Sequence, residues 1–138
     1  MYSPDLETLF RALADRTRLR LLNLMRDQEV CVCFFVQVLQ ATQPKISRHL
    51  AYLRRAGIVA ARRQATWMHY RIVVPRDARA ARILKEVLAS LSEDREMQRD
   101  LVRLNHACCA PQKFVTLQDA PLPVRVSEQF GGEGHASE

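Results

Sequence analysis

Residues 42–57 constrain this chain most, because they predict a helix with one apolar face and one basic face. Ile46, Leu50 and Leu53 follow the i, i+4, i+7 spacing of a buried helical face. Thr42 is a suitable N-cap residue, and Gly57 can adopt the left-handed conformation that ends a helix. The opposite face carries polar and basic side chains, which are Gln43, Lys45, Ser47, Arg48, His49, Arg54 and Arg55.

The polar side chains of this predicted helix gather in its first two turns. Gln, Lys, Ser and Arg bond base edges and phosphates, and a recognition helix needs them near the end that enters the major groove. An ordinary surface helix with solvated charges would show the same pattern. Residues 59–63 and 67–74, however, predict two strands around a short connection. A basic helix followed by a basic hairpin indicates a mostly α winged helix-turn-helix with a small β-hairpin.

The predicted hairpin, or wing, adds further cationic side chains. Arg62, Arg63 and Arg71 are expected to contact the DNA backbone. The connection at 64–66 contains no glycine. Tight two-residue hairpin turns need a positive φ, so we expect a longer or looser connection here.

The charge distribution supports a polyanionic partner. The formal net charge is +6, and residues 111–138 contribute −2, which leaves +8 on residues 1–110. No predicted helix is both basic and strongly apolar, so nucleic acid is favoured over a membrane surface. RNA binding remains open on charge alone.

Length and composition predict one folded domain and an extension. Residues 1–110 are expected to form the DNA-binding and dimerisation domain, and the Pro- and Gly-containing residues 111–138 a loosely ordered tail. The chain has neither an apolar run of membrane-spanning length nor a signal-peptide pattern. We therefore expect a cytoplasmic protein with reduced cysteines.

Four cysteines occur as two close pairs, Cys31 with Cys33 and Cys108 with Cys109. Any single one is more simply explained as a buried structural residue. Two pairs in a reduced protein suggest a site for a soft metal or metalloid, which thiolates select. On a regular helix, residues i and i+2 point about 200° apart. Cys31 and Cys33 can therefore share one ion only if their segment is extended or distorted at a helix start.

Four segments, within roughly residues 5–105, resemble the signatures of the ArsR/SmtB family: ALADRTRLRLL at 12–22, CVC at 31–33, QPKISRHL at 43–50 and WMHYR at 67–71. That family consists of dimeric winged-helix repressors that leave DNA when a metal or metalloid binds. The resemblance implies a homodimer pairing through its first and last helices, the last being expected from Asp77 to about Leu104. It also implies an imperfect palindrome in double-stranded operator DNA.

The cysteine pair ahead of the helix-turn-helix resembles the arsenic-responsive branch, which implies trivalent arsenic (arsenite or methylarsenite) as inducer. The chain departs from that branch at Val36, where a third cysteine is usual, and at Phe34, where an acidic residue is common. A three-thiolate site would then need Cys108 or Cys109.

Three alternatives remain. Two keep the repressor and change the inducer to Cd, Pb or Zn, or to thiol oxidation. The third is a thiol-dependent enzyme, which the lack of a Gly-rich loop and of a Cys-x-x-Cys motif disfavours. We expect no enzymatic activity and no organic cofactor.

Overall fold

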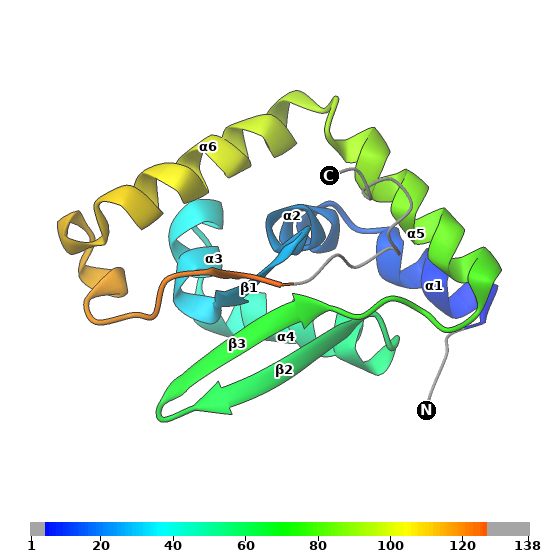
Figure 1. The fold of residues 1–138 in the computed structure, drawn as a ribbon, viewed down its shortest axis with the longest axis horizontal. Helices are drawn as coiled ribbons and strands as arrows, with labels where there is room; N and C mark the ends of the chain where they lie inside the picture. The colour runs from blue at the N-terminus through cyan, green and yellow to red at the C-terminus, as the bar shows by residue number, and fades with distance from the viewer. Residues whose placement is uncertain (1–4, 127–138) are drawn as a thin grey trace.

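The computed structural model describes residues 5–126, which form six α-helices around a small antiparallel sheet (Figure 1). The helices are α1 (Leu6–Leu13), α2 (Arg16–Met25), α3 (Val32–Leu39), α4 (Gln43–Arg55), α5 (Ala78–Leu91) and α6 (Arg95–Cys109). The strands are β1 (Gln28–Cys31), β2 (Val59–Gln64), β3 (Trp67–Ile72) and β4 (Val124–Arg125). This architecture confirms the predicted winged helix-turn-helix. None of the described helices is long and apolar enough to cross a membrane.

Local capping signals set the ends of the helices around the predicted recognition helix. The Asp15 carboxylate accepts a hydrogen bond from the Arg18 N–H at 3.0 Å and begins α2. The Thr42 hydroxyl accepts from the Lys45 N–H at 3.4 Å and begins α4. Gly57 follows α4 with a φ of 83°, the left-handed conformation predicted for it. These helix ends agree with the sequence because each is fixed by residues within one turn.

The sheet has the strand order β2-β3-β1-β4, and β1 is a strand that the sequence did not predict. Residues 27–29 are all polar, as in a loop between helices. Instead, β1 pairs antiparallel with β3 through Val30 opposite Tyr70 and Cys31 opposite His69. Four residues are too few to show the alternating pattern by which a strand is recognised in a sequence. The strand forms because the edge of the hairpin lies beside it. Its consequence is that Cys31, the first residue of the first cysteine pair, belongs to the same sheet as the wing.

The wing turn is tighter than expected. Gln64 pairs with Trp67, which leaves only Ala65 and Thr66 in the connection. Ala65 supplies the positive φ, at 56°. The left-handed conformation costs an L-residue about 1–2 kcal/mol, and the paired strands hold Ala65 there. The prediction of a looser connection is therefore wrong.

Replacing Ala65 with glycine is expected to stabilise the protein. Removing the left-handed penalty, less the extra chain entropy of glycine, should raise the free energy of unfolding by about 0.5–1 kcal/mol. Urea denaturation followed by circular dichroism measures the change. Thr66→Gly is the matched control, because Thr66 has no positive φ and should lose stability. A less stable Ala65→Gly variant would contradict the assignment of strain to this turn.

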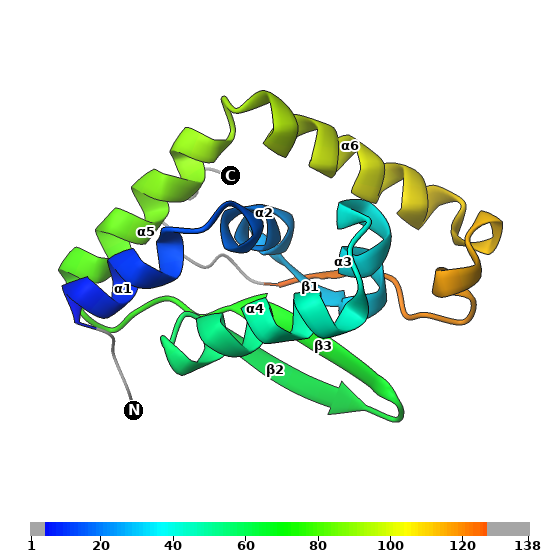
Figure 2. The ribbon, with the colours of Figure 1, turned by 180° about the vertical axis from the view of Figure 1, so that it is seen from behind.

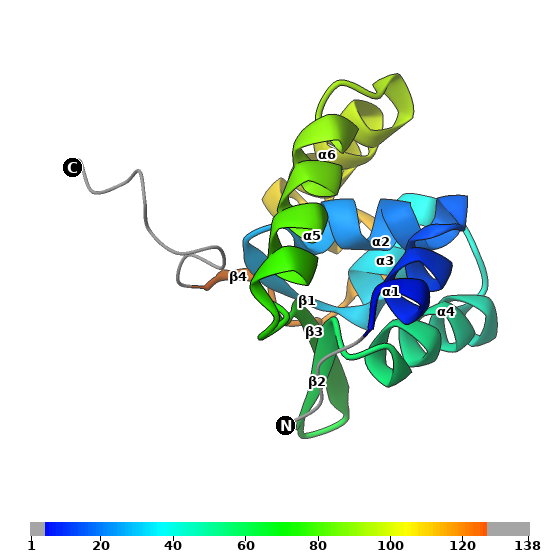
Figure 3. The same ribbon diagram turned by 90° about the vertical axis from the view of Figure 1, so that its right-hand side faces the viewer.

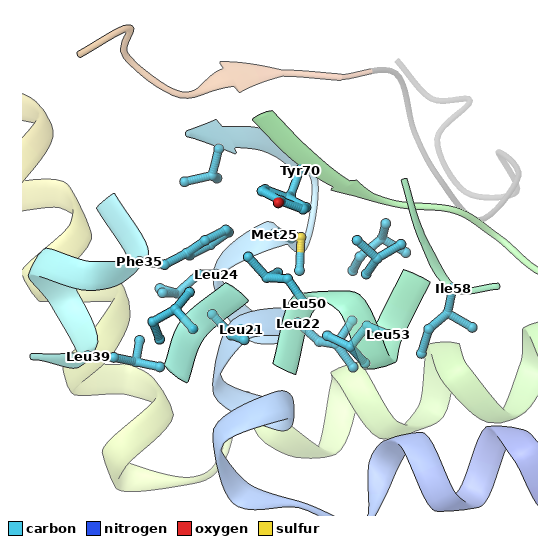
Figure 4. Close-up of a cluster of buried hydrophobic side chains, with 14 of the residues drawn as sticks. Leu21, Leu22, Leu24, Met25, Phe35, Leu39, Leu50, Leu53, Ile58 and Tyr70 are labelled. Atoms are coloured by element: carbon cyan, nitrogen blue, oxygen red, sulfur yellow. The ribbon is translucent and has the colours of Figure 1, made fainter. Parts of the chain in front are cut away.

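The core lies between α2, α3, α4 and the inner face of the sheet (Figure 4). Leu21, Leu22, Leu24 and Met25 of α2 occupy its centre and are fully buried. Tyr70 of β3 points into it, with its ring 6.4 Å from that of Phe35. Leu50 and Leu53 of α4 reach the same cluster. Because α3 and α4 share this core, a displacement at the start of α3 bears directly on the position of α4.

The expected single long C-terminal helix is instead two helices. α5 ends at Leu91, and the Asp94 carboxylate begins α6 by accepting from the N–H groups of Glu96 and Met97 at 2.9 and 3.2 Å. Arg16 holds the same carboxylate at 2.7 Å. α6 then runs across α2 and α3 (Figures 1 and 3). The helical spacing of the buried apolar residues of α5 does not continue in phase at Met97, which agrees with this change of helix.

Residues 111–126, here called the C-terminal strap, pack on the domain, although composition suggested a loose tail. The strap contains the short 3₁₀ helices η1 (Pro111–Lys113) and η2 (Val115–Leu117). Leu117 is buried, and the Thr116 hydroxyl donates to the Gln37 side chain of α3 at 2.6 Å. β4 then pairs antiparallel with β1 (Figure 1). The rest of the expected tail, 127–138, lies outside the described residues, as do residues 1–4.

Candidate functional site

The exposed face of α4 carries most of the side chains predicted to meet DNA. Gln43, Lys45 and Arg48 are exposed, and Ser47 is half-buried. Figure 2 shows α4 beside the β2–β3 hairpin, with both at the same edge of the molecule. Ile46 and Leu50 hold the helix to the core from its other face. The arrangement places a polar, cationic helix face next to a cationic hairpin, as groove and backbone contacts require.

His49 lies away from this exposed face. Its Nδ1 is 3.8 Å from an Asp15 carboxylate oxygen and 3.5 Å from the Arg18 guanidinium. Burial lowers the pKa of His49, so the ring is mainly neutral at pH 7. The structure therefore gives His49 a role in packing α4 against the start of α2, where the sequence suggested a DNA contact.

The wing arginines differ in their surroundings. Arg63 is exposed. Arg62 is held by the Glu29 carboxylate, with Nη2 at 2.6 Å from Oε1, and Arg71 Nε lies 3.9 Å from Glu29 Oε2. The hydrogen bond from Arg62 lowers the pKa of Glu29. Sequence reasoning missed Glu29, because only the unpredicted β1 brings it to the wing.

Cys31 and Cys33 converge in the way that the sequence argument required. Cys31 is the N-cap of α3, with an extended backbone at φ −72° and ψ 144°, and Cys33 lies in the first turn. Their sulfur atoms are 3.5 Å apart. Two thiolates bound about 2.3 Å from one tetrahedral ion would lie about 3.8 Å apart. The pair can therefore bind one thiophilic ion with little rearrangement.

The two thiols also differ in acidity. A hydrogen bond from the Cys33 thiol lowers the pKa of Cys31 to about 7. The N–H groups of Val32 and Cys33, at the start of α3, act in the same direction. The shared contact, together with burial, raises the pKa of Cys33. Near neutral pH the pair thus holds one readily formed thiolate, which is the nucleophilic and ion-binding form.

The second cysteine pair stands at the end of α6. Cys108 is half-buried, and burial followed by the neighbouring Cys109 raises the pKa of its thiol. Cys109 is exposed. Across residues 5–126, no three His, Cys, Asp or Glu side chains are grouped so that they could hold one metal ion. Cys108 and Cys109 therefore do not complete a three-ligand site with Cys31 and Cys33 within this protomer.

The known proteins that this chain resembles are transcriptional regulators. Residues 15–61 match the family described as "Bacterial regulatory protein, arsR family". The chain is 42% identical over 99 residues to the arsenical resistance operon repressor of Escherichia coli K12, covering 70% of this chain and 85% of that protein.

Two solved structures are similar as well. The transcriptional repressor BigR from Xylella fastidiosa is 30% identical, with a TM-score of 0.52 over 64% of this chain and 84% of that one. The AntR antimony-specific transcriptional repressor is 34% identical, with a TM-score of 0.51 over 63% and 77%.

Proposed function

Because this chain belongs to the arsR family of bacterial regulatory proteins and is a transcriptional repressor, not an enzyme, we propose that a trivalent arsenical releases it from its operator. The inducer binds Cys31 and Cys33. The observation that carries the proposal is the 3.5 Å separation of these sulfurs at the start of α3, one helix before α4. The similarity to an arsenical resistance repressor and to an antimony-specific repressor supports a metalloid inducer.

The operator is an imperfect palindrome in double-stranded DNA, bound by a homodimer. Large apolar side chains are exposed on the first and last helices of the described protomer, with Leu6 40%, Phe10 52% and Val102 58% exposed. Burying them against a second copy would remove apolar surface from water. Symmetric pairing would also direct two α4 helices to two half-sites one DNA turn apart.

In the complex, Gln43, Lys45, Ser47 and Arg48 face the groove, and Arg63 contacts the backbone. We expect the logarithm of the DNA association constant to fall with log salt by about 0.9 per phosphate neutralised. Arg48→Ala should weaken specific binding by roughly 1–3 kcal/mol if the guanidinium reads a base. Fluorescence anisotropy with a palindromic duplex and its scrambled version measures both.

Lys113→Ala on η1 removes the same charge far along the chain from α4 and serves as the control for this experiment. It should leave the specific affinity close to that of the unmodified protein. Equal affinity for the palindromic and the scrambled duplex would contradict specific operator binding.

The thiol pair favours an arsenical that needs two thiolates. A methylated arsenical has one valence blocked, so Cys31 and Cys33 would complete its coordination. Arsenite prefers three thiolates, and the third would have to come from Cys108 or Cys109 of a second copy, since the described protomer groups no third ligand there. Ligation would fix the start of α3, and the core shared with α4 would carry the change to the DNA-binding face. Arsenical and DNA affinities must then oppose each other by the same factor.

The same sulfur separation favours a second inducer chemistry, in which Cys31 and Cys33 are oxidised to a disulfide. Native mass spectrometry separates the candidates, because a disulfide loses two hydrogens whereas an arsenical, Cd²⁺, Pb²⁺ or Zn²⁺ adds its own mass. It also reports whether the bound species is a dimer.

A further inference from the structure

One face of the sheet carries a charged cluster made of Glu29, Arg62, His69 and Arg71. Opposed residues in an antiparallel pair share a face, and successive residues alternate between faces. His69 stands opposite both Cys31 on β1 and Arg62 on β2. The same register places Arg71 opposite Glu29. The cluster and Cys31 therefore lie on one face, and Tyr70 points from the other face into the core (Figure 4).

Glu29 is the only acidic member of this cluster and is nearly buried, at 8% exposed. Its carboxylate accepts from Arg62 Nη2 at 2.6 Å and from Arg62 Nε at 3.2 and 3.3 Å. This ion pair reaches from β1 to β2 across β3. His69 lies in that span and is 3% exposed. Burial, and then the charge of Arg62, lower the pKa of His69, so the ring adds no charge to the cluster near pH 7.

The two arginines are tied to Glu29 but are not buried with it. The side chains of Arg62 and Arg71 are 50% and 46% exposed. Each can therefore turn from the carboxylate toward solvent without unfolding the hairpin. A DNA phosphate would have to compete with Glu29 for both of them. In the protein without DNA, Glu29 thus neutralises one unit of the positive charge of the wing internally.

Glu29 also stands two residues before Cys31 on the same short strand. We propose that Glu29 is a positioning residue that withholds Arg62 and Arg71 from DNA phosphates and so links the thiol segment to the wing. In the DNA-bound state Arg71, whose Nε lies 3.9 Å from the carboxylate, turns to the backbone, while Arg62, at 2.6 Å, stays on Glu29. In the arsenical-bound state Glu29 keeps both arginines. This inference rests on the proposed function, in which Cys31 and Cys33 receive the inducer.

Glu29→Gln tests the proposal, because the amide keeps the shape of the side chain and removes its charge. DNA binding of the variant should depend more steeply on salt. One extra phosphate neutralised per protomer would make the log–log slope more negative by about 1.8 for a dimer. The ratio of dissociation constants with and without methylarsenite should also shrink, by at least about fivefold if the coupling is of ordinary size.

Two further variants locate the effect. Glu86→Gln makes the same charge change on the exposed surface of α5 and should leave both the slope and the ratio as in the unmodified protein. Adding Arg62→Gln to Glu29→Gln should bring the salt slope most of the way back to that of the unmodified protein, because it removes the arginine charge that Glu29→Gln sets free. Thermal unfolding in parallel shows whether Glu29→Gln keeps the fold. If Glu29→Gln does not fold, the single variant Arg62→Gln decides instead. Because Glu29 withholds Arg62 from the DNA, removing this guanidinium should leave the salt dependence of DNA binding nearly the same as in the parent protein.

The proposal would be overturned if folded Glu29→Gln showed the same salt slope for DNA binding as the unmodified protein. It would also be overturned if the salt slope became steeper while the ratio of dissociation constants with and without methylarsenite did not shrink. Failure of the proposed function looks different. There, the unmodified protein itself would stay on DNA when methylarsenite is added, and the slope comparison would still decide whether Glu29 withholds the arginines.

Discussion

Cys31→Ser and Cys33→Ser are each expected to leave operator binding intact and to abolish release by arsenite and methylarsenite. Either change removes one of two sulfur atoms that lie 3.5 Å apart, and a serine hydroxyl does not replace a thiolate for a soft ion. The ratio of DNA dissociation constants with and without arsenical should fall from about 5–150, a typical range for allosteric coupling, to one. Fluorescence anisotropy of labelled operator DNA, titrated at fixed arsenical concentration, measures this ratio.

The matched control changes Cys108 and Cys109 to serine together. These two thiols lie at the end of α6, outside the Cys31–Cys33 pair. The double variant should keep its methylarsenite response and lose more of its arsenite response, since only arsenite needs a third thiolate. A full arsenite response in this variant would rule out a shared site. A retained response in Cys31→Ser or Cys33→Ser would remove the basis of the proposed function.

Asp100→Ala is expected to produce the largest loss of stability. Asp100 is fully buried in α6 and accepts two hydrogen bonds from the Arg20 guanidinium, at 2.7 and 3.0 Å. Removing the carboxylate leaves a largely buried arginine without this partner, which typically destabilises a protein by about 3–5 kcal/mol. Urea denaturation of the variant and the parent protein, followed by circular dichroism, measures the difference.

An exposed ion pair provides the comparison. Asp27 and Arg125 are paired on the surface, with side chains 48% and 79% exposed, so Asp27→Ala should change stability by less than about 1 kcal/mol. Replacing Arg20 and Asp100 together by apolar residues of similar volume should recover much of the lost stability, because no charge is then left buried. Equal small losses for Asp27→Ala and Asp100→Ala would show that burial of the α2–α6 pair contributes little.

Sequence reasoning succeeded where neighbouring residues determine the structure. The caps at Asp15 and Thr42 and the left-handed Gly57 each depend on one helical turn, and all three are observed. The condition for Cys31 and Cys33 to converge could be stated in the same way, because a regular helix points residues i and i+2 apart and an extended or distorted segment at a helix start does not. The observed N-cap position of Cys31 satisfies that condition.

The features that sequence reasoning missed depend on contacts between distant residues. β1 is a strand because β3 lies beside it, and nothing in residues 28–31 alone indicates this. His49 has the spacing of a DNA contact, yet the position of α2 turns it toward Asp15. The tight turn at Ala65 is held by the strand pairs on either side, against the preference of alanine. Glu29 could be connected to the wing only after β1 was known.

The C-terminal strap also protects the sheet from unwanted association. Without β4, the outer side of β1 would present unpaired N–H and C=O groups, and such an edge is a template for aggregation. β4 covers that side with only two residues, and Pro123 just before it cannot donate to another strand. The charged side chain of Arg125 further discourages a new neighbour. The strap therefore ends the sheet, and a chain shortened at residue 110 would expose an aggregation-prone strand edge on β1, which ends at Cys31.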